Sequence, residues 1–378
     1  MLRAATIVFM AGAVFFCHYC TTQSDESDSV STSIQTDEGQ HGWTLEPGSG
    51  ADTHEEIAAM WNCPQEKVHL LQVSGFIKNP FKDKPFLPTY LRYKDAVLYV
   101  CDEYSNNVVK FDSKLEYLGS VFEDGYIDPE ENVALLRIDD EDRVVLTGQR
   151  YVYFSGENQR KLRNLYGLQR LIPFNNQLLS PNWGWVLSSR EVMFDILDYD
   201  LKHIKSVGKQ MYLISDDDRT TNTYVNVIGD KIYIVPSHCV TFGVMNTTSY
   251  DIEEVRLDAG DEIRIMEENN KKNLEDPTNY KSRKIFSDAA VLGNKLYAMS
   301  AFKMSRDKNY ISIIEFDDRL KRNNIFYYNY VDSDEYEVYV HHMAAFAGQG
   351  IVHFAMTIRA TVEIENCSVI YIFSVKKW

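Results

Sequence analysis

The sequence predicts an all-β fold, and two observations lead to that prediction. Tyr and Phe are abundant, at 24 and 19 of 378 residues, and aromatic residues favour strands. A unit of polar turn, strand, turn and strand recurs at intervals of about 35 to 65 residues. Such a unit cannot bury its faces alone. Its six copies therefore predict a six-bladed β-propeller of four-stranded antiparallel blades over residues 67–378.

The chain begins with the features of an export signal. Arg3 precedes an apolar stretch, residues 4–16, that is too short to span a bilayer and suits a signal peptide. The stretch ends at Cys17 and resembles a bacterial lipoprotein signal, in which a cysteine becomes the acylated first residue of the mature protein. Residues 1–16 are therefore predicted to be a signal peptide and Cys17 the lipidation site. An ordinary cleaved signal is the alternative.

Residues 17–50 are predicted to form a lipidated, acidic and disordered tether. Ser, Thr, Asp, Glu and Gly dominate this segment, and apolar residues are few. Arg3 is the only basic residue before Lys67, whereas ten acidic residues lie there; 38 basic and 45 acidic residues remain in the rest of the chain. Nucleic-acid binding needs a basic surface, so nucleic acid is excluded as a partner.

Two segments break the strand pattern. Residues 51–66 are predicted to hold a short helix and a linker, because Asp52 and Glu55 have capping-box spacing and Pro64 ends the helix. Ile57, Met60 and Trp61 share one face of this helix, which is expected to pack on the rim of the propeller. Residues 258–288 are a polar, charged insertion that is long enough for a helical excursion or a lid. A solvated loop is the favoured interpretation of this insertion.

The repeat is clearest in residues 94–118. Its turn and first strand recur in residues 140–146, 175–179, 229–235, 293–299 and 348–354. An aromatic residue followed by Asp ends a later strand at residues 111–112, 199–200 and 316–317. Asp, Asn and Gly in the turns supply the positive φ that tight hairpins require. The last strand ends near the C-terminus, so residues 67–73 are expected to supply the outer strand that closes the ring.

These repeats resemble the TolB-like and NHL-like six-bladed β-propellers that occur as lipoproteins in Gram-negative bacteria. Residues 91–146 carry most of the resemblance, including residues 125–130, where relatives often show a Gly-Pro-Glu loop. The resemblance implies an outer-membrane lipoprotein that faces the periplasm or the cell surface. The membrane is then a partner through the lipid anchor. The family carries no single activity, so the resemblance implies a fold and not a function.

Motifs for chemistry are weak, and no cofactor or metal is predicted. His341 and His342 are adjacent on a predicted strand, so their side chains are expected to point to opposite faces and not to chelate one ion. The run Asp216–Asp218 lacks the spacing of a calcium loop and is interpreted as a solvated turn.

The cysteines and two tryptophans also favour structural roles. The cysteines of the folded region lack zinc spacing and are expected to be buried free thiols; they are Cys63, Cys101, Cys239 and Cys367. Trp183 and Trp185 share a strand face, where they are expected to pack between blades, with stacking on a sugar as the alternative.

The geometry of a propeller gives a better guide to the site than the motifs do. Residues at the start of each innermost strand converge on the central funnel. The ligand-binding candidates there are Tyr90, Arg92, Asn132, Arg170, Asn222, Tyr224, Asp288 and His342. Guanidinium groups bind carboxylate and sulfate through paired hydrogen bonds, so Arg92 and Arg170 favour an anionic or polar ligand.

The predicted function is a non-catalytic cell-envelope binding or scaffold module. Its ligand would be a glycan, a peptide or an envelope protein held at the central funnel. The alternative is a metal-dependent propeller hydrolase or lactonase, which would need funnel carboxylates and amides as metal ligands. Arg92 and Arg170 would repel a cation there, so binding is favoured, and the question of catalysis stays open.

Overall fold

The structure is a computed structural model that describes residues 45, 47–48, 53–164, 168, 170–181, 192–211, 223–275, 283–305, 308–332, 336–348, 351–362 and 365–375. The chain divides into two units, Met1–Glu46 and Pro47–Trp378, and every helix and strand named below belongs to the second. Trp183, Trp185 and Asp216–Asp218 lie outside the described residues, as do Cys17 and the predicted signal peptide. Within the described ranges, no helix is long and apolar enough to cross a bilayer.

Four four-stranded antiparallel sheets follow one another along the chain, each with its strands in sequence order. The first contains β2 (Pro88–Lys94), β3 (Val97–Asp102), β4 (Asn107–Phe111) and β5 (Tyr117–Ser120). The second contains β6 (Val133–Ile138), β7 (Val144–Gly148), β8 (Tyr151–Phe154) and β9 (Arg160–Arg163). The third contains β10 (Ile172–Phe174), β11 (Gln177–Pro181), β12 (Val192–Leu197) and β13 (His203–Lys209). The fourth contains β14 (Thr223–Ile228), β15 (Lys231–Pro236), β16 (Thr241–Asn246) and β17 (Ile252–Arg256).

The remaining strands form one eight-stranded sheet. Its members are β18 (Asp288–Leu292), β19 (Lys295–Ser305), β20 (Lys308–Phe316), β21 (Arg322–Tyr330), β1 (Val68–Ile77), β24 (Glu365–Val375), β23 (Ile351–Val362) and β22 (Tyr336–Gly348). β1 pairs antiparallel with β24 through residues 71–77, as predicted for the strand that follows the tether. The start of β1 also pairs in parallel with β21, through residues 68–70. The sequence predicted separate four-stranded blades, and this second pairing is why the last two strand groups share one sheet.

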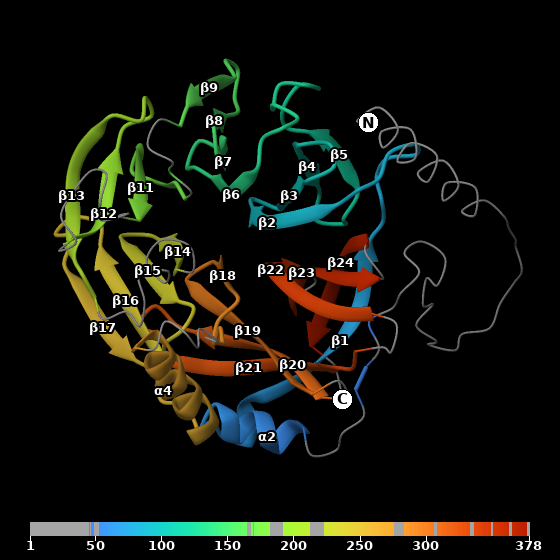
Figure 1. Cartoon of the computed structure of the whole chain (residues 1–378), viewed down its shortest axis with the longest axis vertical. Coiled ribbons are helices and arrows are strands. Elements are labelled where there is room, and N and C mark those ends of the chain that lie inside the picture. The colour runs from blue at the N-terminus through green and yellow to red at the C-terminus, as the bar shows by residue number, and fades with distance from the viewer. Residues whose placement is uncertain are drawn as a thin grey trace, which may run out of the picture. The chain divides into compact units, whose positions relative to one another are not determined.

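The sheets are arranged around a centre like the blades of a propeller (Figure 1). The first strand of each group lies innermost, and these inner strands contact one another in succession. The contacts join β2 to β6, β6 to β10, β10 to β14, β14 to β18, β18 to β22, and β22 back to β2. The inner strands therefore form a closed ring, and five of the predicted funnel residues lie on these strands: Tyr90, Arg92, Tyr224, Asp288 and His342.

Hairpin turns confirm several of the predicted repeat starts. Asn175, Gly229 and Gly293 each lie between the first and second strands of a group, with φ angles of 44°, 59° and 59°. Gly and Asn adopt this left-handed backbone at least cost, which explains the residue types that mark the repeat.

The Asp of the predicted aromatic-Asp pair has a structural role in the next turn. Oδ1 of Asp112 accepts hydrogen bonds from the backbone N–H groups two and four residues later, and Asp317 does the same. In the third sheet Asp198 makes these bonds, so the equivalent pair there is Leu197-Asp198 and not the predicted Tyr199-Asp200. The Asp recurs in the repeat because its side chain accepts the backbone hydrogen bonds that stabilise the turn before the outer strand.

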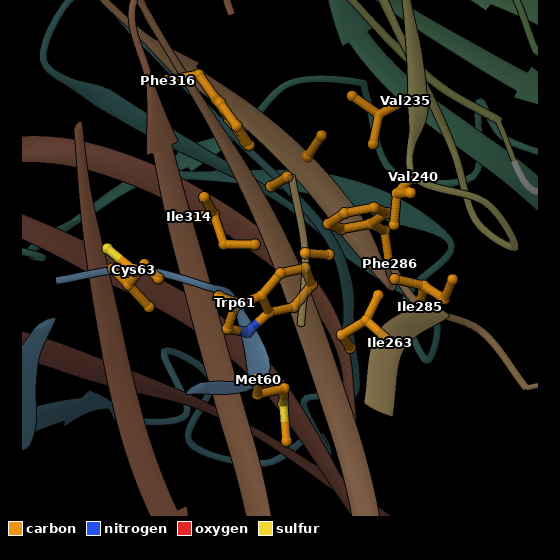
Figure 2. Close-up of a cluster of buried hydrophobic side chains, with 14 of the residues drawn as sticks. Met60, Trp61, Cys63, Val235, Val240, Ile263, Ile285, Phe286, Ile314 and Phe316 are labelled. Carbon is orange, nitrogen blue, oxygen red and sulfur yellow. The ribbon is translucent and has the colours of Figure 1, made fainter. Parts of the chain in front are cut away.

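The predicted N-terminal helix is present as α2 (Thr53–Met60), followed by the short 3-10 helix η1 (Gln65–Lys67). Ile57, Met60 and Trp61 are buried, which confirms the predicted apolar face. The Trp61 ring lies 5.8 Å from that of Phe286 between centroids, in a cluster of buried side chains beside the fourth and fifth strand groups (Figure 2). The helix therefore covers the rim of the propeller with its apolar face.

The insertion differs from the favoured loop interpretation, because residues 261–275 form the helix α4 (Asp261–Glu275). The buried face of α4 includes Ile263, Glu267 and Asn270. Glu267 accepts a hydrogen bond from the Val240 N–H, at 3.0 Å, and Asn270 donates to the carbonyl of His238, at 3.1 Å. A face built largely from polar side chains lacks the apolar periodicity that predicts a helix.

Close backbone contact holds α4 against the end of α2. The Gly260 N–H donates to the Met60 carbonyl at 2.9 Å, and a Cβ at position 260 would lie 2.1 Å from the Ala59 carbonyl oxygen. Only glycine permits this approach. Arg322 of β21 donates to the carbonyl groups of Trp61, Asn62 and Asp258. It therefore connects the segment after α2 and the segment before α4 to β21.

Two isoleucines of α4 test this packing. Ile263 is 1% exposed and Ile265 is 56% exposed. We expect Ile263→Ala to lower the free energy of unfolding by about 3 kcal/mol, because the substitution leaves a cavity among packed side chains. The matched control Ile265→Ala should change it by less than about 0.5 kcal/mol. Urea unfolding measures both values, and equal effects would show that the helix does not pack as described.

Candidate functional site

Three neighbouring inner strands are irregular at the same end of the ring. In β2, Thr89 and Tyr90 together occupy the place opposite Cys101, between the pairs that flank them. One extra residue also lies between Val133 and Leu135 of β6, and one between Val340 and His342 of β22. β-Bulges of this kind redirect side chains and are frequent beside functional sites.

These irregular segments line one cavity of about 570 Å³. Its volume falls within the range of small-molecule sites. Most of its lining side chains are polar or charged. They are Thr89, Tyr90, Cys101, Glu103, Asn106, Pro129, Glu130, Glu131, Asn132, Val133, His341, His342, Thr357 and Arg359.

The cavity contains only part of the predicted site. Tyr90, Asn132 and His342 line it, whereas the other candidates with described positions do not: Arg92, Arg170, Tyr224 and Asp288. Asn222 lies outside the described residues. Glu103, Thr357 and Arg359 were missed because they lie on second strands or their turns, not at the start of an inner strand.

His341 and His342 both line the cavity, contrary to the expectation that they point to opposite faces. The reason is the bulge in β22, where Val340 pairs with Ile358 and His342 pairs with Thr357, which leaves His341 without a partner in the ladder. The extra residue breaks the alternation of side chains along the strand. The two imidazole centroids lie 6.3 Å apart.

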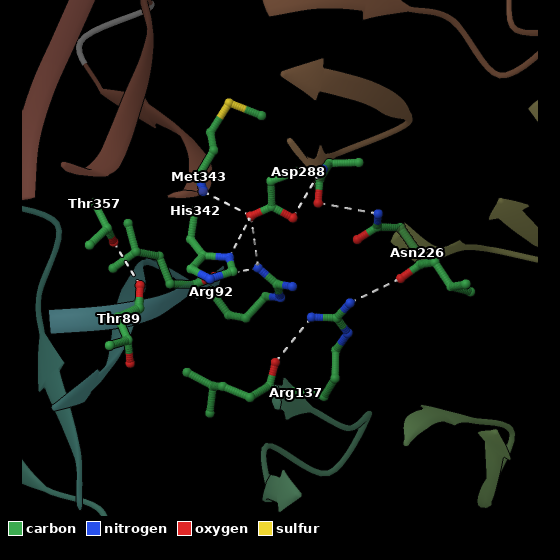
Figure 3. Close-up of polar contacts among 12 residues, drawn as sticks. Thr89, Arg92, Arg137, Asn226, Asp288, His342, Met343 and Thr357 are labelled. Atoms are coloured by element: carbon green, nitrogen blue, oxygen red, sulfur yellow. Dashed lines mark hydrogen bonds and ion pairs between the residues drawn. The ribbon is translucent and has the colours of Figure 1, made fainter. Parts of the chain in front are cut away.

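Asp288 forms the centre of a polar cluster behind the cavity (Figure 3). Its Oδ2 accepts a hydrogen bond from the Met343 N–H at 2.9 Å, and lies 3.4 Å from Nδ1 of His342 and 3.8 Å from Nη1 of Arg92. Its Oδ1 accepts from the Ala289 N–H at 2.8 Å. Burial alone would raise the pKa of the Asp288 carboxyl. The Arg92 charge, His342 and the Met343 N–H outweigh burial and lower that pKa.

The same cluster fixes the charge of His342. Burial lowers the pKa of His342 by more than the Asp288 carboxylate raises it, and the positive charges of Arg92 and Arg170 lower it further. The imidazole is therefore neutral at pH 7. Its ring centroid lies 4.3 Å from that of Tyr90, so the two aromatic side chains form one wall of the cavity.

Arg92 turns away from the cavity toward this cluster. Its Nη1 donates to the Leu91 carbonyl at 2.6 Å and faces Asp288, whereas its buried Nε has no hydrogen-bond partner. Burial lowers the pKa of Arg92, and Asp288 opposes that shift, but a guanidinium stays charged in proteins. Arg92 and Asp288 thus join β2 to β18, which belong to different sheets.

A third arginine, which the sequence analysis missed, crosses the centre in the same way. Arg137 of β6 is 8% exposed and donates to the carbonyl groups of Leu136, at 3.1 Å, and Val225 of β14, at 3.2 Å (Figure 3). The signal was present in the chain, because Leu91-Arg92 and Leu136-Arg137 occupy similar places on their strands and both arginines donate to the preceding carbonyl.

Arg170 also has an internal partner. Its Nη1 donates to the Thr223 carbonyl at 2.7 Å, and its guanidinium carbon lies 5.6 Å from the centroid of the Tyr224 ring. Tyr224 is buried in a cluster shared with the rim helices. The two predicted anion-binding arginines thus contact Asp288 or backbone carbonyl groups, and the expected preference for an anion loses its basis in the cavity.

The thiol that lines the cavity is not activated as a nucleophile. Burial raises the pKa of the Cys101 thiol to about 12, so it stays protonated. Cys63 and Cys239 are likewise buried free thiols, as predicted, and the side chain of Cys367 lies outside what the structure describes. The described residues also contain no group of three His, Cys, Asp or Glu side chains placed to hold a metal ion.

No protein-family model matches the chain, and no curated protein matches it. Among solved structures, the chain is similar to a Bacteroides fragilis protein that carries the provisional name of an exported protein. The two share 11% identity with a TM-score of 0.51, over 82% of this chain and 99% of the other. At this identity the likeness shows a shared fold alone.

Two lyase structures resemble the chain more distantly. A streptogramin B lyase has a TM-score of 0.43 at 10% identity, over 81% of this chain and 98% of the other. Virginiamycin B lyase from Staphylococcus aureus has a TM-score of 0.41 at 10% identity, over 81% and 99%. TM-scores this low carry no argument about this chain, which stands as an all-β, propeller-like protein of four-stranded antiparallel units.

Proposed function

We propose that the protein is an exported, membrane-tethered binding module that holds a polar ligand in the 570 Å³ cavity without turning it over. One observation carries the proposal: three neighbouring inner strands, β2, β6 and β22, each depart from regular pairing where they line this cavity. Irregular pairing sacrifices hydrogen bonds between strands. Three irregular strands that line the same cavity are therefore typical of a recognition site.

The arginines behind the cavity support a preorganised site. Arg92 contacts Asp288 of β18, and Arg137 donates to a carbonyl of β14, so both cross from one sheet to another. Because these contacts are buried, they hold the inner strands in a fixed relation before a ligand arrives. A site fixed in advance loses less entropy on binding.

Binding without turnover fits the chemistry of the cavity better than the hydrolase alternative. The hydroxyl groups of Thr89 and Thr357 donate to backbone carbonyls, and the Cys101 thiol is protonated, so none of the three is prepared as a nucleophile. A metal-dependent hydrolase would need a set of ligands that the described residues do not offer.

We also propose that the eight-stranded sheet acts as two blades, which makes six blades in all and relates the chain to TolB-like and NHL-like propellers. The parallel pairing between β1 and β21 covers three residue pairs, whereas β1 and β24 pair from Leu71 to Ile77. Three parallel pairs bind weakly compared with that antiparallel ladder.

Export and anchoring rest on the N-terminal sequence. Residues 4–16 are apolar and end at Cys17, and the acidic stretch behind them suits a tether on an outer-membrane lipoprotein. A lipid at this position would hold the propeller at the membrane while leaving the cavity free to meet a ligand in the periplasm or outside the cell.

The blade count can be checked by amide hydrogen exchange. We expect the amides of residues 68–70 to exchange much faster than those of residues 71–77, because the short parallel pairing opens without disturbing either blade. Equal protection along the whole of β1 would indicate one continuous eight-stranded sheet instead.

Membrane anchoring can be tested by replacing cysteines near the signal. Cys17→Ala should move the protein from the membrane to the soluble fraction and abolish the lipid adduct seen by mass spectrometry. The matched control Cys20→Ala should leave both unchanged. A membrane-bound Cys17→Ala protein, with no lipid on either variant, would refute lipidation at this site.

Ligand binding can be tested by filling the cavity. We expect a thermal-shift panel of oligosaccharides and peptides to give hits for the wild type that Asn132→Trp abolishes, because the indole occupies the cavity at its exposed side. The control Lys114→Trp places the same side chain on an exposed turn of the first sheet and should keep every hit. Hits that survive Asn132→Trp would place the site elsewhere.

A further inference from the structure

Three hydrogen-bond donors of the cavity wall are already engaged with backbone carbonyls. Thr89 Oγ1 donates to the Cys101 carbonyl at 3.1 Å, and Thr357 Oγ1 donates to the Thr89 carbonyl at 2.7 Å. Asn106 Nδ2 donates to the Pro129 carbonyl at 2.8 Å. A hydroxyl has one proton and two lone pairs, so the two threonine oxygens can now only accept a hydrogen bond from a ligand.

The charged side chains of the wall are also mostly acceptors. Glu103, Glu130 and Glu131 line the cavity, against one guanidinium, Arg359. Arg359 Nη2 donates to Glu103 at 2.6 Å, so its charge is already balanced. Glu131 is buried and accepts from the backbone N–H of Arg150, at 2.9 Å. The Arg150 guanidinium lies outside the lining, 3.4 Å from Glu130 and 3.0 Å from Asp128, so each of these two carboxylates shares its charge. With neutral histidines, three carboxylates against one guanidinium leave the wall with a formal charge of −2.

His342 adds an acceptor that does not depend on the carboxylates. Its Nδ1 lies 3.4 Å from Asp288 Oδ2, and a carboxylate can only accept, so the proton of the neutral ring belongs on Nδ1. Nε2 then carries a lone pair. It has no hydrogen-bond partner among the described residues, and the side chain that bears it lines the cavity and is 22% exposed.

We propose that the cavity recognises a protonated primary amine. This inference rests on the proposed function, because it names the ligand chemistry for the same cavity. An ammonium group has three donors and no acceptor, which complements the threonine oxygens, the glutamates and His342 Nε2. Its positive charge suits a wall of formal charge −2. A carboxylate or sulfate would instead meet lone pairs and like charge.

The amine could belong to a sugar or to a lysine side chain, and paired probes separate these sources. One pair is a glucosamine trimer and its fully N-acetylated form. The other is Nα-acetyl-lysine methylamide and its Nε-acetylated form. We expect the amine of at least one pair to bind the full-length protein, by calorimetry at pH 7, at least about tenfold more tightly than its acetylated form. The pair that discriminates identifies the source.

Substitutions of the glutamates in the cavity wall test whether their charge causes the preference for amines. Glu130→Gln keeps the shape of an 84% exposed side chain and removes one charge, and should weaken amine binding severalfold. Glu103→Gln/Glu130→Gln should weaken it by at least about tenfold. The matched control Glu253→Gln, on exposed β17, should have no effect.

Three results would overturn the amine proposal: no binding of either amine at millimolar concentration, acetylated forms that bind as well as the amines, or tighter binding of glucuronate than of glucosamine. The proposed function is judged separately. If acetylated or anionic probes bind and Asn132→Trp abolishes that binding, the cavity is the ligand site and only its charge preference is wrong. If Asn132→Trp leaves such binding intact, the proposed function fails as well.

Discussion

The buried carboxylate of Asp288 is the contact on which the centre of this molecule depends. It accepts from its neighbour Ala289 on β18 and from Met343 on β22, and it faces Arg92 on β2 and the imidazole of His342. One side chain therefore connects three inner strands at the place where the ring closes. A buried carboxylate is costly unless hydrogen bonds and opposite charge compensate it, and this one has both. The same carboxylate sets the tautomer of His342 and so leaves Nε2 as an acceptor at the cavity. Asp288 therefore contributes both to the closure of the ring and to the polarity of the cavity.

Much of the fold could be predicted because its local rules appear in the chain. Gly229 and Gly293 mark hairpins by their backbone freedom, and Asp112 and Asp317 mark turns by the N–H groups that their side chains accept. The helix before Pro64 was predictable from the apolar face that ends in Trp61. Each of these signals acts over a few residues, which is why the sequence alone reveals them.

Other features depend on contacts between distant residues, and the sequence does not show these. Helix α4 escapes prediction because Glu267 and Asn270 fill its buried face with hydrogen bonds to the loop around His238. The parallel pairing of β1 with β21 joins residues 68–70 to residues 325–327, and no local pattern specifies it. In the site, the bulge at His341 depends on the register with β23, so the sequence predicted the usual alternation of side chains.

The structure brings some of the candidate residues to the cavity and places others away from it. Tyr90, Asn132 and His342 line the cavity as expected of residues at the start of inner strands. Arg92 was expected to face a ligand, yet its long side chain reaches Asp288 instead. The sequence predicts which strand carries a residue, but it does not predict which partner the side chain contacts. Because the arginines contact internal partners, the cavity is rich in hydrogen-bond acceptors, whereas the funnel was predicted to attract anions.

The unfolding free energy of Asp288→Asn tests the central role of this carboxylate most directly. The substitution leaves Arg92 buried without its counter-charge, so we expect a loss of about 3 kcal/mol at pH 7 in urea unfolding. The lowered pKa of Asp288 means that its contribution is complete above the unfolded value of 3.8 and is lost as the pH falls through the folded value. The difference between wild type and variant should therefore shrink in acid. The control Asp200→Asn removes an exposed partner of Arg160 and should cost less than about 1 kcal/mol. A loss for Asp288→Asn no larger than that of the control would contradict the account.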